Sequence, residues 1–268
     1  MRGIVPLVGQ TVHRVIIRHP TLRWPIPSHL EDTLPQAKLT QLKRRAKYIL
    51  AEFDNAEGVT IGTLILHLGM SGRICLLAED EVAAKHDHFD IHFNDGQVLR
   101  LRDPRRFGAV LWANVHESVA EHPLMKTLGP EPLEVDFTGE YLYRQLRNKS
   151  TAIKIAIMDS HLVVGVGNIY ASESLFRARI NPKMPANKVS KAICERLVAE
   201  IKATLAEAIE AGGSSLRDFF GADGNPGYFQ QTYFVYGRTD QPCRECSAPI
   251  SQIKQGQRST FYCAECQR

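Results

Sequence analysis

The sequence predicts a multidomain α+β protein, with a strand-rich first part, a helical second part and a small metal-binding module at the end. Three observations support this prediction. Apolar residues follow strand spacing up to about residue 115, and helical spacing begins after a stretch rich in proline and glycine. Two Cys-x-x-Cys pairs then close the chain. Its 268 residues are enough for two domains with cores of their own.

The first part of the chain carries the strand patterns. We expect strands over Thr11–Ile17, Val59–Leu68, Phe89–Phe93, Val98–Leu101 and Val110–Trp112. The turn signal Asn94-Asp95-Gly96 joins two of them in a hairpin. Such strands indicate a β-sandwich or a barrel-like domain. We expect one helix to interrupt it, over Leu39–Tyr48, where apolar residues have helical spacing and a basic cluster follows them.

The second part follows a linker marked by Pro123 and by Gly129-Pro130-Glu131-Pro132. Its periodicity predicts helices over Gly139–Arg147, Thr151–Met158, Asn168–Arg179 and Val189–Ala211. Gly212-Gly213 would end the last helix, because glycine is the usual residue just past a helix terminus. A glycine-rich loop over Gly221–Gly227 leads to the cysteine module.

Composition excludes several classes of protein. With 44% hydrophobic and 23% charged residues the chain is typical of soluble globular proteins, and it has neither a membrane-spanning run nor a signal-peptide pattern. Outside the quartet the cysteines are Cys75 and Cys194, which fits a reducing compartment, so we expect a cytoplasmic protein. The net charge of +4 permits a nucleic-acid partner without requiring one.

The cysteine quartet is the most specific single motif. Cys243, Cys246, Cys263 and Cys266 form two Cys-x-x-Cys pairs that flank a potential hairpin, and four thiolates at this spacing can close a tetrahedral Zn²⁺ site. Zinc would then supply the folding energy of a segment that buries little apolar surface, on the order of 10 kcal/mol. Two disulfides or a chance cluster are the alternative interpretations of these cysteines.

Two stretches of the first part place an apolar side chain where it could project from a tight turn. His67-Leu68-Gly69-Met70-Ser71-Gly72 sets Met70 between glycines, and Asp103-Pro104-Arg105-Arg106-Phe107-Gly108 sets Phe107 beside two arginines. An apolar wedge next to arginine suits an enzyme that opens a duplex and fills the gap left by an extruded base. The alternative is that Met70 and Phe107 are core residues.

Residues of the second part suggest phosphate binding. Asn168 follows Gly165-Val166-Gly167 and is expected to be the N-cap of a helix whose backbone amides face an anion. Lys149 and Lys154 could contact the same phosphate backbone, and Arg258 lies on the strand that approaches the second cysteine pair. The alternatives are a cap that only ends a helix, and lysines that are merely solvated.

The chain resembles bacterial formamidopyrimidine-DNA glycosylase, a base-excision enzyme for oxidised purines, over essentially its whole length. Seven motifs carry this resemblance in addition to the cysteine module. They are Arg44-Arg45-Ala46-Lys47-Tyr48, His67 to Gly72, Lys85-His86-Asp87-His88, Asp103 to Gly108, the run Val163 to Glu173, Ser215-Leu216-Arg217-Asp218-Phe219, and Asp223-Gly224-Asn225-Pro226-Gly227-Tyr228.

The resemblance implies a fold and a domain order. We expect an N-terminal β-sandwich over residues 1–118 that is truncated at its start, then a linker over 119–136. A helix-two-turn-helix DNA-binding domain over 137–232 would include a mobile lesion-capping loop at Ser215–Tyr228, and a zinc finger would occupy 233–268. DNA would lie between the domains. One structural zinc ion is implied, with no part in bond breaking, since four cysteines leave no open position on the metal.

The resemblance also implies roles for individual residues. Met70, Arg105 and Phe107 match the three residues that fill the space of the flipped nucleotide. Asn168 and Arg258 match a clamp on the phosphates that flank the lesion, and His86 and Lys149 match further DNA contacts. Lys47 matches a lysine assigned a proton-donor role in β-elimination, while Arg258 is also assigned to δ-elimination. The implied partner is double-stranded DNA with oxidised bases or abasic sites, bound by a monomer beside the bacterial nucleoid.

The sequence departs from the family at its beginning. Family members carry a processed N-terminal proline, whose amine attacks the sugar C1′, followed by a glutamate, and this chain has neither; Pro6 is internal, and its amide nitrogen is not nucleophilic. One explanation is that the natural start lies upstream. The other is a shortened protein that binds damaged DNA without excision. For the polypeptide as printed we expect strongly reduced glycosylase and lyase activity, which efficient borohydride trapping on oxidised-guanine DNA would contradict.

Restored at its start, the chain is expected to remove formamidopyrimidine and 8-oxoguanine bases and to cut the strand by β,δ-elimination. Two further functions stay open at this point. An enzyme like endonuclease VIII would prefer oxidised pyrimidines, although Met70, Arg105, Phe107 and the Ser215–Tyr228 loop favour the purine enzyme. A zinc-ribbon adaptor would explain the cysteines and the charge, but it would not need the two wedge-like loops.

Overall fold

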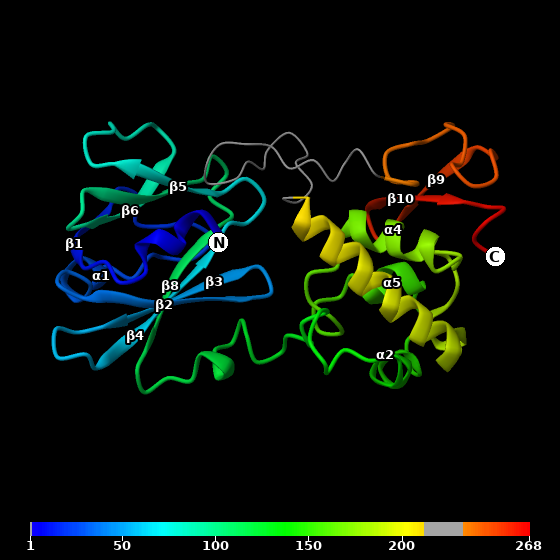
Figure 1. Cartoon of the computed structure of the whole chain (residues 1–268), viewed down its shortest axis with the longest axis horizontal. Coiled ribbons are helices and arrows are strands. Elements are labelled where there is room, and N and C mark those ends of the chain that lie inside the picture. The colour runs from blue at the N-terminus through cyan, green and yellow to red at the C-terminus, as the bar shows by residue number, and fades with distance from the viewer. Residues whose placement is uncertain (1, 212–232) are drawn as a thin grey trace. The chain divides into compact units, whose positions relative to one another are not determined.

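The computed structural model describes residues 2–211 and 233–268 (Figure 1). The described residues divide into two compact units, the first comprising residues 2–126 and the second comprising 127–211 and 233–268. The finer domain limits expected from the sequence stay predictions. The expected helix end at Gly212-Gly213 and the loop over Ser215–Tyr228 lie outside the described residues.

The first unit consists of two four-stranded antiparallel sheets, seen as layers in Figure 1. One has the order β1-β6-β7-β5 and the other β2-β3-β4-β8. The strands are β1 (Val12–Ile17), β2 (Lys38–Arg45), β3 (Tyr48–Asp54), β4 (Thr60–His67), β5 (Arg73–Ala78), β6 (Asp87–Phe93), β7 (Gln97–Arg102) and β8 (Ala109–Asn114). Short helices cover Arg2–Leu7 (η1), Leu30–Thr33 (α1) and Val119–Glu121 (η2). The five predicted strands are present, and β2, β3 and β5 add to them.

Apolar side chains from both sheets meet in one core, which makes this unit the expected sandwich. Phe53 and Leu64 of one sheet and Phe89 and Ile91 of the other belong to the same buried cluster. β3 shows the cause most clearly, because alternate residues along it are buried. The Asn94-Asp95-Gly96 turn joins β6 to β7 as predicted, and Gly96 takes the positive φ of 80° that such a turn requires.

The helix predicted over Leu39–Tyr48 is wrong: this segment is β2, a tight turn and the start of β3. A register shift between Leu39 and Gln41 adds one residue to β2, so Leu39 and Leu42 face the core at a spacing of three. That spacing imitates a helix. Ala46, with φ of 53°, then turns the chain back so that β3 pairs with β2. The basic cluster therefore lies on an edge strand, where charged side chains discourage pairing with other chains.

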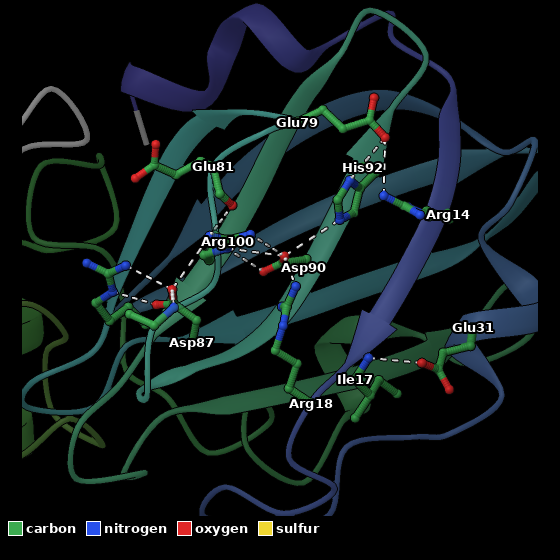
Figure 2. A network of polar contacts seen from close by, with 12 residues as sticks. Arg14, Ile17, Arg18, Glu31, Glu79, Glu81, Asp87, Asp90, His92 and Arg100 are labelled. Carbon is green, nitrogen blue, oxygen red and sulfur yellow. Dashed lines mark hydrogen bonds and ion pairs between the residues drawn. The ribbon is translucent and has the colours of Figure 1, made fainter.

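The face of β6 opposite the core carries a buried polar network (Figure 2). Arg100 donates to both carboxylate oxygens of Asp90, at 2.9–3.1 Å, and Arg18 pairs with the same carboxylate at 2.7 Å. Arg100 also donates to the Glu81 carbonyl oxygen at 3.1 Å. Through this bond the network holds the irregular segment before β6 against the sheet. Because each buried charge has a partner, the alternation of β6 can place polar residues on one face at acceptable cost.

The second unit contains the four predicted helices, as α2 (Gly139–Leu146), α3 (Ile153–Ile157), α4 (Asn168–Arg177) and α5 (Lys191–Glu210), together with a short η3 (Ala186–Lys188). Two of them begin with a side-chain cap. Thr138 accepts a hydrogen bond from the Tyr141 amide at 3.1 Å, and Ser190 accepts one from the Ile193 amide at 3.3 Å. The helices share one apolar core. None of the helices within the described ranges has the length and apolar character needed to cross a membrane.

A two-stranded hairpin, β9 (Ile250–Gln255) and β10 (Arg258–Cys263), closes the second unit. Its turn residues Gly256 and Gln257 both have positive φ, at 50° and 65°, as in a type I′ turn. An added Cβ on Gly256 would lie 2.9 Å from Cδ1 of Ile155. The turn therefore packs closely on α3, and Arg258 is the first residue after it.

Candidate nucleic-acid interface

In the first unit, the loop after β4 and the loop after β7 pack against each other through their backbones. Gly69 has φ of 62°, and an added Cβ there would lie 2.6 Å from the Phe107 carbonyl carbon. An added Cβ on Gly108 would lie 2.7 Å from the His67 carbonyl oxygen. Both glycines are thus required by the close approach of the two loops, and Gly69 is required by its conformation as well.

These loops present two large apolar side chains to solvent. Met70 is 50% exposed and Phe107 is 48% exposed, so neither belongs to the core. The guanidinium carbon of Arg105 lies 5.3 Å from the centre of the Phe107 ring, which is a cation–π distance. The structure thus brings Met70, Arg105 and Phe107 onto one pair of loops. In such an arrangement the apolar side chains can enter a base stack, and the neighbouring cation can contact a phosphate of the same duplex.

Lys47 is exposed in the turn between β2 and β3, and the next residue, Tyr48, pairs with His67 at the end of β4. Lys47 acts electrostatically on His67, whose ring lies 4.8 Å from that of Tyr48 and whose Nδ1 accepts from the Gly69 amide at 3.0 Å. Burial, followed by the charges of Lys47 and Arg23, lowers the pKa of His67. A neutral imidazole therefore supports the turn that presents Met70. His67 belongs to a motif recognised in the sequence but had no role assigned.

His86 precedes β6 and is joined to the second loop through the backbone. Its carbonyl oxygen accepts from the Asp103 amide at 2.9 Å, and its ring lies 6.4 Å from that of His88. All five DNA-contact or catalytic residues predicted in the first unit therefore belong to adjoining segments. They are Lys47, Met70, His86, Arg105 and Phe107.

In the second unit, Asn168 is not the N-cap of α4, contrary to the prediction. Gly167 occupies that position, without a side-chain cap bond. Asn168 instead turns to the hairpin: its Nδ2 donates to the Ser259 carbonyl oxygen at 3.0 Å, and its Oδ1 accepts from Lys154. The Gly167 backbone is extended and leaves the asparagine as the first helical residue, which directs its amide group away from its own helix.

Lys154 is neither a solvated lysine nor a phosphate contact, because it is fully buried. Its ammonium group donates to Asn168 Oδ1, to the Ser259 carbonyl oxygen at 3.2 Å and to Thr260 Oγ1 at 2.8 Å. These three bonds use its three donors. Burial, followed by the charge of Arg258, lowers the pKa of Lys154 to about 8. The lysine thus joins α3, α4 and β10 into one support.

Lys149 and Arg258 line the same open cavity of about 560 Å³, together with Ser150, Thr151 and Gly256. The Lys149 ammonium lies 3.6 Å from Asp159, and both side chains are partly exposed. Hydroxyl groups and two cations at one concave surface are suited to a phosphate group. Asn168 is linked to this cavity through Ser259, the residue after Arg258. The DNA contacts expected of Lys149, Asn168 and Arg258 stay predictions.

Glu173 is an important residue of this region that the sequence interpretation left without a role. It is 1% exposed, and its carboxylate accepts from the backbone amides of Phe234, Val235 and Tyr236 at 2.8–3.0 Å. It therefore fixes the segment that enters the zinc module onto α4. In the sequence, Glu173 is an acidic residue within an apolar stretch of a helix. This pattern predicts that the carboxylate has a buried partner, but it does not identify the partner.

The four cysteine sulfurs can hold one metal ion. Sγ of Cys243 and Cys266 lie 3.9 Å apart, those of Cys246 and Cys263 lie 3.5 Å apart, and all four lie within 4.8 Å of one another. A tetrahedral zinc with bonds of about 2.3 Å requires sulfur separations of roughly 3.8 Å. The thiolate set and its spacing therefore fit a structural Zn²⁺. The two sulfur separations exceed the roughly 2.05 Å of a disulfide bond, and all four cysteines are free, so the arrangement favours a metal site over two disulfides.

Comparison with known families gives three matches along the chain. Residues 1–110 match the formamidopyrimidine-DNA glycosylase N-terminal domain, and residues 128–220 match the helix-two-turn-helix domain of the same family. Residues 240–268 match a zinc finger found in this glycosylase and in isoleucyl-tRNA synthetase.

Relatives and solved structures agree with these matches over the full chain. The formamidopyrimidine-DNA glycosylase of Methylobacillus flagellatus is 62% identical, covering 100% of this chain and 93% of the relative. That of a Janthinobacterium species is 54% identical, covering 100% and 96%. A Lactococcus lactis enzyme solved with abasic-site DNA has a TM-score of 0.89 at 31% identity, covering 100% and 96%. The Thermus thermophilus enzyme has a TM-score of 0.85 at 33% identity, covering 99% and 95%.

Proposed function

We infer the function of this chain from its family and from its loops: it belongs to the formamidopyrimidine-DNA glycosylases, and it carries two joined loops with half-exposed apolar tips. It is a DNA glycosylase and abasic-site lyase for the repair of oxidised purines. The pairing of Met70 and Phe107 on these loops is the observation that supports this function best. A zinc-ribbon adaptor would have no use for it.

The substrate that we propose is double-stranded DNA with a formamidopyrimidine, an 8-oxoguanine or an abasic site. Lactococcus lactis relatives have been solved with formamidopyrimidine DNA and with abasic-site DNA. Met70 and Phe107 would enter the stack as the damaged nucleotide leaves it, at a cost of a few kcal/mol for unstacking. Arg105, held beside Phe107, would follow the same path and neutralise a phosphate.

The second unit would hold the flanking phosphates. Arg258 and Lys149 bring two positive charges to one cavity, and α4 offers the backbone amides of its first turn next to Asn168. Because Lys154 is occupied internally, its contribution would be to hold Asn168 and β10 in place. His86 of the first unit would add a further contact.

The chemical roles rest on fewer residues. Lys47 would supply a proton during β-elimination, and Arg258 would assist δ-elimination. Zinc would stiffen the finger that carries Arg258, since four thiolates leave no site on the metal for substrate. Such an enzyme would work in the bacterial cytoplasm, beside the nucleoid.

The test compares one duplex with and without a tetrahydrofuran abasic-site analogue. We expect the full chain to bind the damaged duplex at least about tenfold more tightly in moderate salt, because only that duplex accepts the loops without loss of a base pair. Equal affinities would contradict the proposal. Release of 8-oxoguanine, measured for the chain and for a version extended by a proline-glutamate segment, then tests the chemistry separately from binding.

A further inference from the structure

We propose that Asp103 is a positioning residue that sets the two apolar loops and His86 in one arrangement for lesion recognition. The inference rests on the proposed function and adds to it a residue that never faces the DNA. Asp103 is 0% exposed, so its carboxylate can act only through the groups around it.

The carboxylate of Asp103 bonds to both loops at once. Its Oδ1 accepts from the Ser71 hydroxyl at 2.8 Å and from the Arg105 amide at 3.3 Å. Its Oδ2 accepts from the Gly108 amide at 2.8 Å. Ser71 follows Met70 directly, whereas Arg105 and Gly108 bracket the segment that carries Phe107. The carboxylate therefore fixes the neighbours of all three side chains that the first unit would insert.

The backbone of Asp103 extends the same arrangement to the histidines. Its amide donates to the His86 carbonyl oxygen at 2.9 Å, and its own carbonyl oxygen lies 2.9 Å from Nε2 of His88. Burial is the main cause that lowers the pKa of His88, so the ring is neutral and donates Nε2–H to this carbonyl. One residue thus connects both loops with the segment that presents His86.

An acceptor-only group is the chemistry that this position requires. Three donors converge on Asp103, a hydroxyl and two backbone amides, and a buried donor without an acceptor is costly. The β4–β8 ladder joins the bases of the two loops at His67 and Ala109. Beyond the ladder, the close backbone contacts at Gly69 and Gly108 resist compression but not separation. Loss of the carboxylate should therefore let Met70 and Phe107 move apart while the sandwich core stays folded.

Asp90, on β6 of the same unit, provides a matched control. It is also 0% exposed, but its bonds go to Arg100 and Arg18, on the face of β6 opposite the core (Figure 2). Asp90→Asn should weaken the fold through the loss of buried charge pairing without changing the geometry of the loops. Any loss of recognition that merely follows loss of stability would then appear in this variant also.

The experiment uses the full chain and measures three quantities for Asp103→Ala, Asp103→Asn, Ser71→Ala and Asp90→Asn. These are the melting temperature, the ratio of affinities for the tetrahydrofuran duplex and the undamaged duplex, and the fluorescence rise of 2-aminopurine placed opposite the lesion. The probe reports unstacking of the orphaned base when the loops enter.

We expect Asp103→Ala to lower the affinity ratio by about tenfold, as for the loss of one buried hydrogen-bonded group, and to abolish most of the fluorescence rise. Asp103→Asn should recover only part of both, because its amide oxygen can accept from the Gly108 amide, whereas its amino group can donate to the Ser71 hydroxyl but cannot accept from the Arg105 amide. Ser71→Ala removes a single bond and should lower the ratio by about threefold. Asp90→Asn should lower the melting temperature and keep the ratio.

An unchanged ratio and fluorescence rise in Asp103→Ala would overturn the inference. If that variant does not fold, an unchanged ratio in both Ser71→Ala and Asp103→Asn, with no change in fluorescence, would overturn it as well. Parallel losses of the ratio in Asp103→Ala and Asp90→Asn would also overturn it, since they would show a general effect of stability. A wild-type chain without preference for the damaged duplex would overturn the proposed function, and this inference with it.

Discussion

The two units present their candidate DNA contacts in different ways. In the first unit, half-exposed apolar tips stand on loops that contact each other and a buried carboxylate. In the second unit, cationic groups line a cavity supported by a buried lysine and a metal-binding hairpin. Apolar tips distinguish a duplex that opens easily from one that does not, whereas cations bind the phosphates of either. Lesion recognition should therefore depend on the first unit, and general affinity on the second.

The two units also differ in what holds them together. The sandwich of the first unit has a large apolar core shared by both sheets. The zinc module packs its few apolar residues, among them Val235, Ile250 and Phe261, around cysteines that would bind the metal. Metal should therefore matter for the second unit alone. Four predictions test this division, in order of decreasing effect.

Removing the zinc should have the largest effect. Cys246→Ser should release the ion and unfold the hairpin that carries Arg258, so that affinity for damaged and undamaged duplexes alike falls by more than about tenfold. Metal content by mass spectrometry and affinity by fluorescence anisotropy provide the check. Cys75→Ser, on β5 of the first unit, is the control and should keep both. Retained affinity in a zinc-free Cys246→Ser protein would contradict the role of the zinc-bound hairpin in general DNA affinity.

Truncating the aromatic tip should affect only damaged DNA. Phe107→Ala should cost about 1–3 kcal/mol of affinity for the tetrahydrofuran duplex, the range of one stacked aromatic, with no change for the undamaged duplex. Val115→Ala removes an apolar group that is equally exposed, at 49%, and should change neither affinity. If Phe107→Ala bound the damaged duplex as tightly as the wild type, the adaptor interpretation would gain support instead.

Removing one cation of the cavity should act on both duplexes equally. Arg258→Ala should weaken binding to each by a similar factor and reduce the slope of log affinity against log salt by about one, as for one lost phosphate contact. Lys254→Ala takes the same charge from the exposed face of β9 and should leave the slope close to that of the wild type. A loss confined to the damaged duplex would place Arg258 in lesion recognition rather than in general affinity.

The smallest effect concerns pH and the buried lysine. The pKa of Lys154 is lowered to about 8, below the value of about 10.4 for an unfolded lysine. Below pH 8 both states hold the proton and this group adds no slope. Between these values the unfolded state binds more protons, so the free energy of unfolding should rise with pH. Urea unfolding should show this rise in the wild type but not in Lys154→Met, while equal slopes in the two proteins across the window would show that the folded protein keeps the charge.

Local patterns predicted much of the fold. The hairpin over β6 and β7 follows from its turn residues, and the helices of the second unit follow from apolar spacing. The helix predicted over Leu39–Tyr48 was wrong because one added residue in β2 gives its apolar residues a spacing like that of a helix. Only the pairing of β2 with β3 distinguishes a bulged strand from a helix here, and a pattern read along one segment does not include that pairing.

The candidate site shows the same limit at the level of single residues. The sequence motifs identified Met70, Phe107, Arg258 and the four cysteines, because each has an unusual residue type or spacing that is visible in the chain itself. They could not show that Lys154 is buried, that Asn168 turns away from its helix, or that Glu173 holds the segment before the zinc module. Each of these facts depends on a partner tens of residues away.

The sequence by itself therefore determined the family, the zinc ligands and most residues proposed to meet DNA, since short spacings and turn chemistry encode them. The tertiary structure decided how these residues are held. Asp103 is an ordinary aspartate in its motif until folding brings Ser71, Arg105 and Gly108 to its carboxylate. A buried polar group must find its partners wherever the chain places them, and that demand is met only in the folded protein.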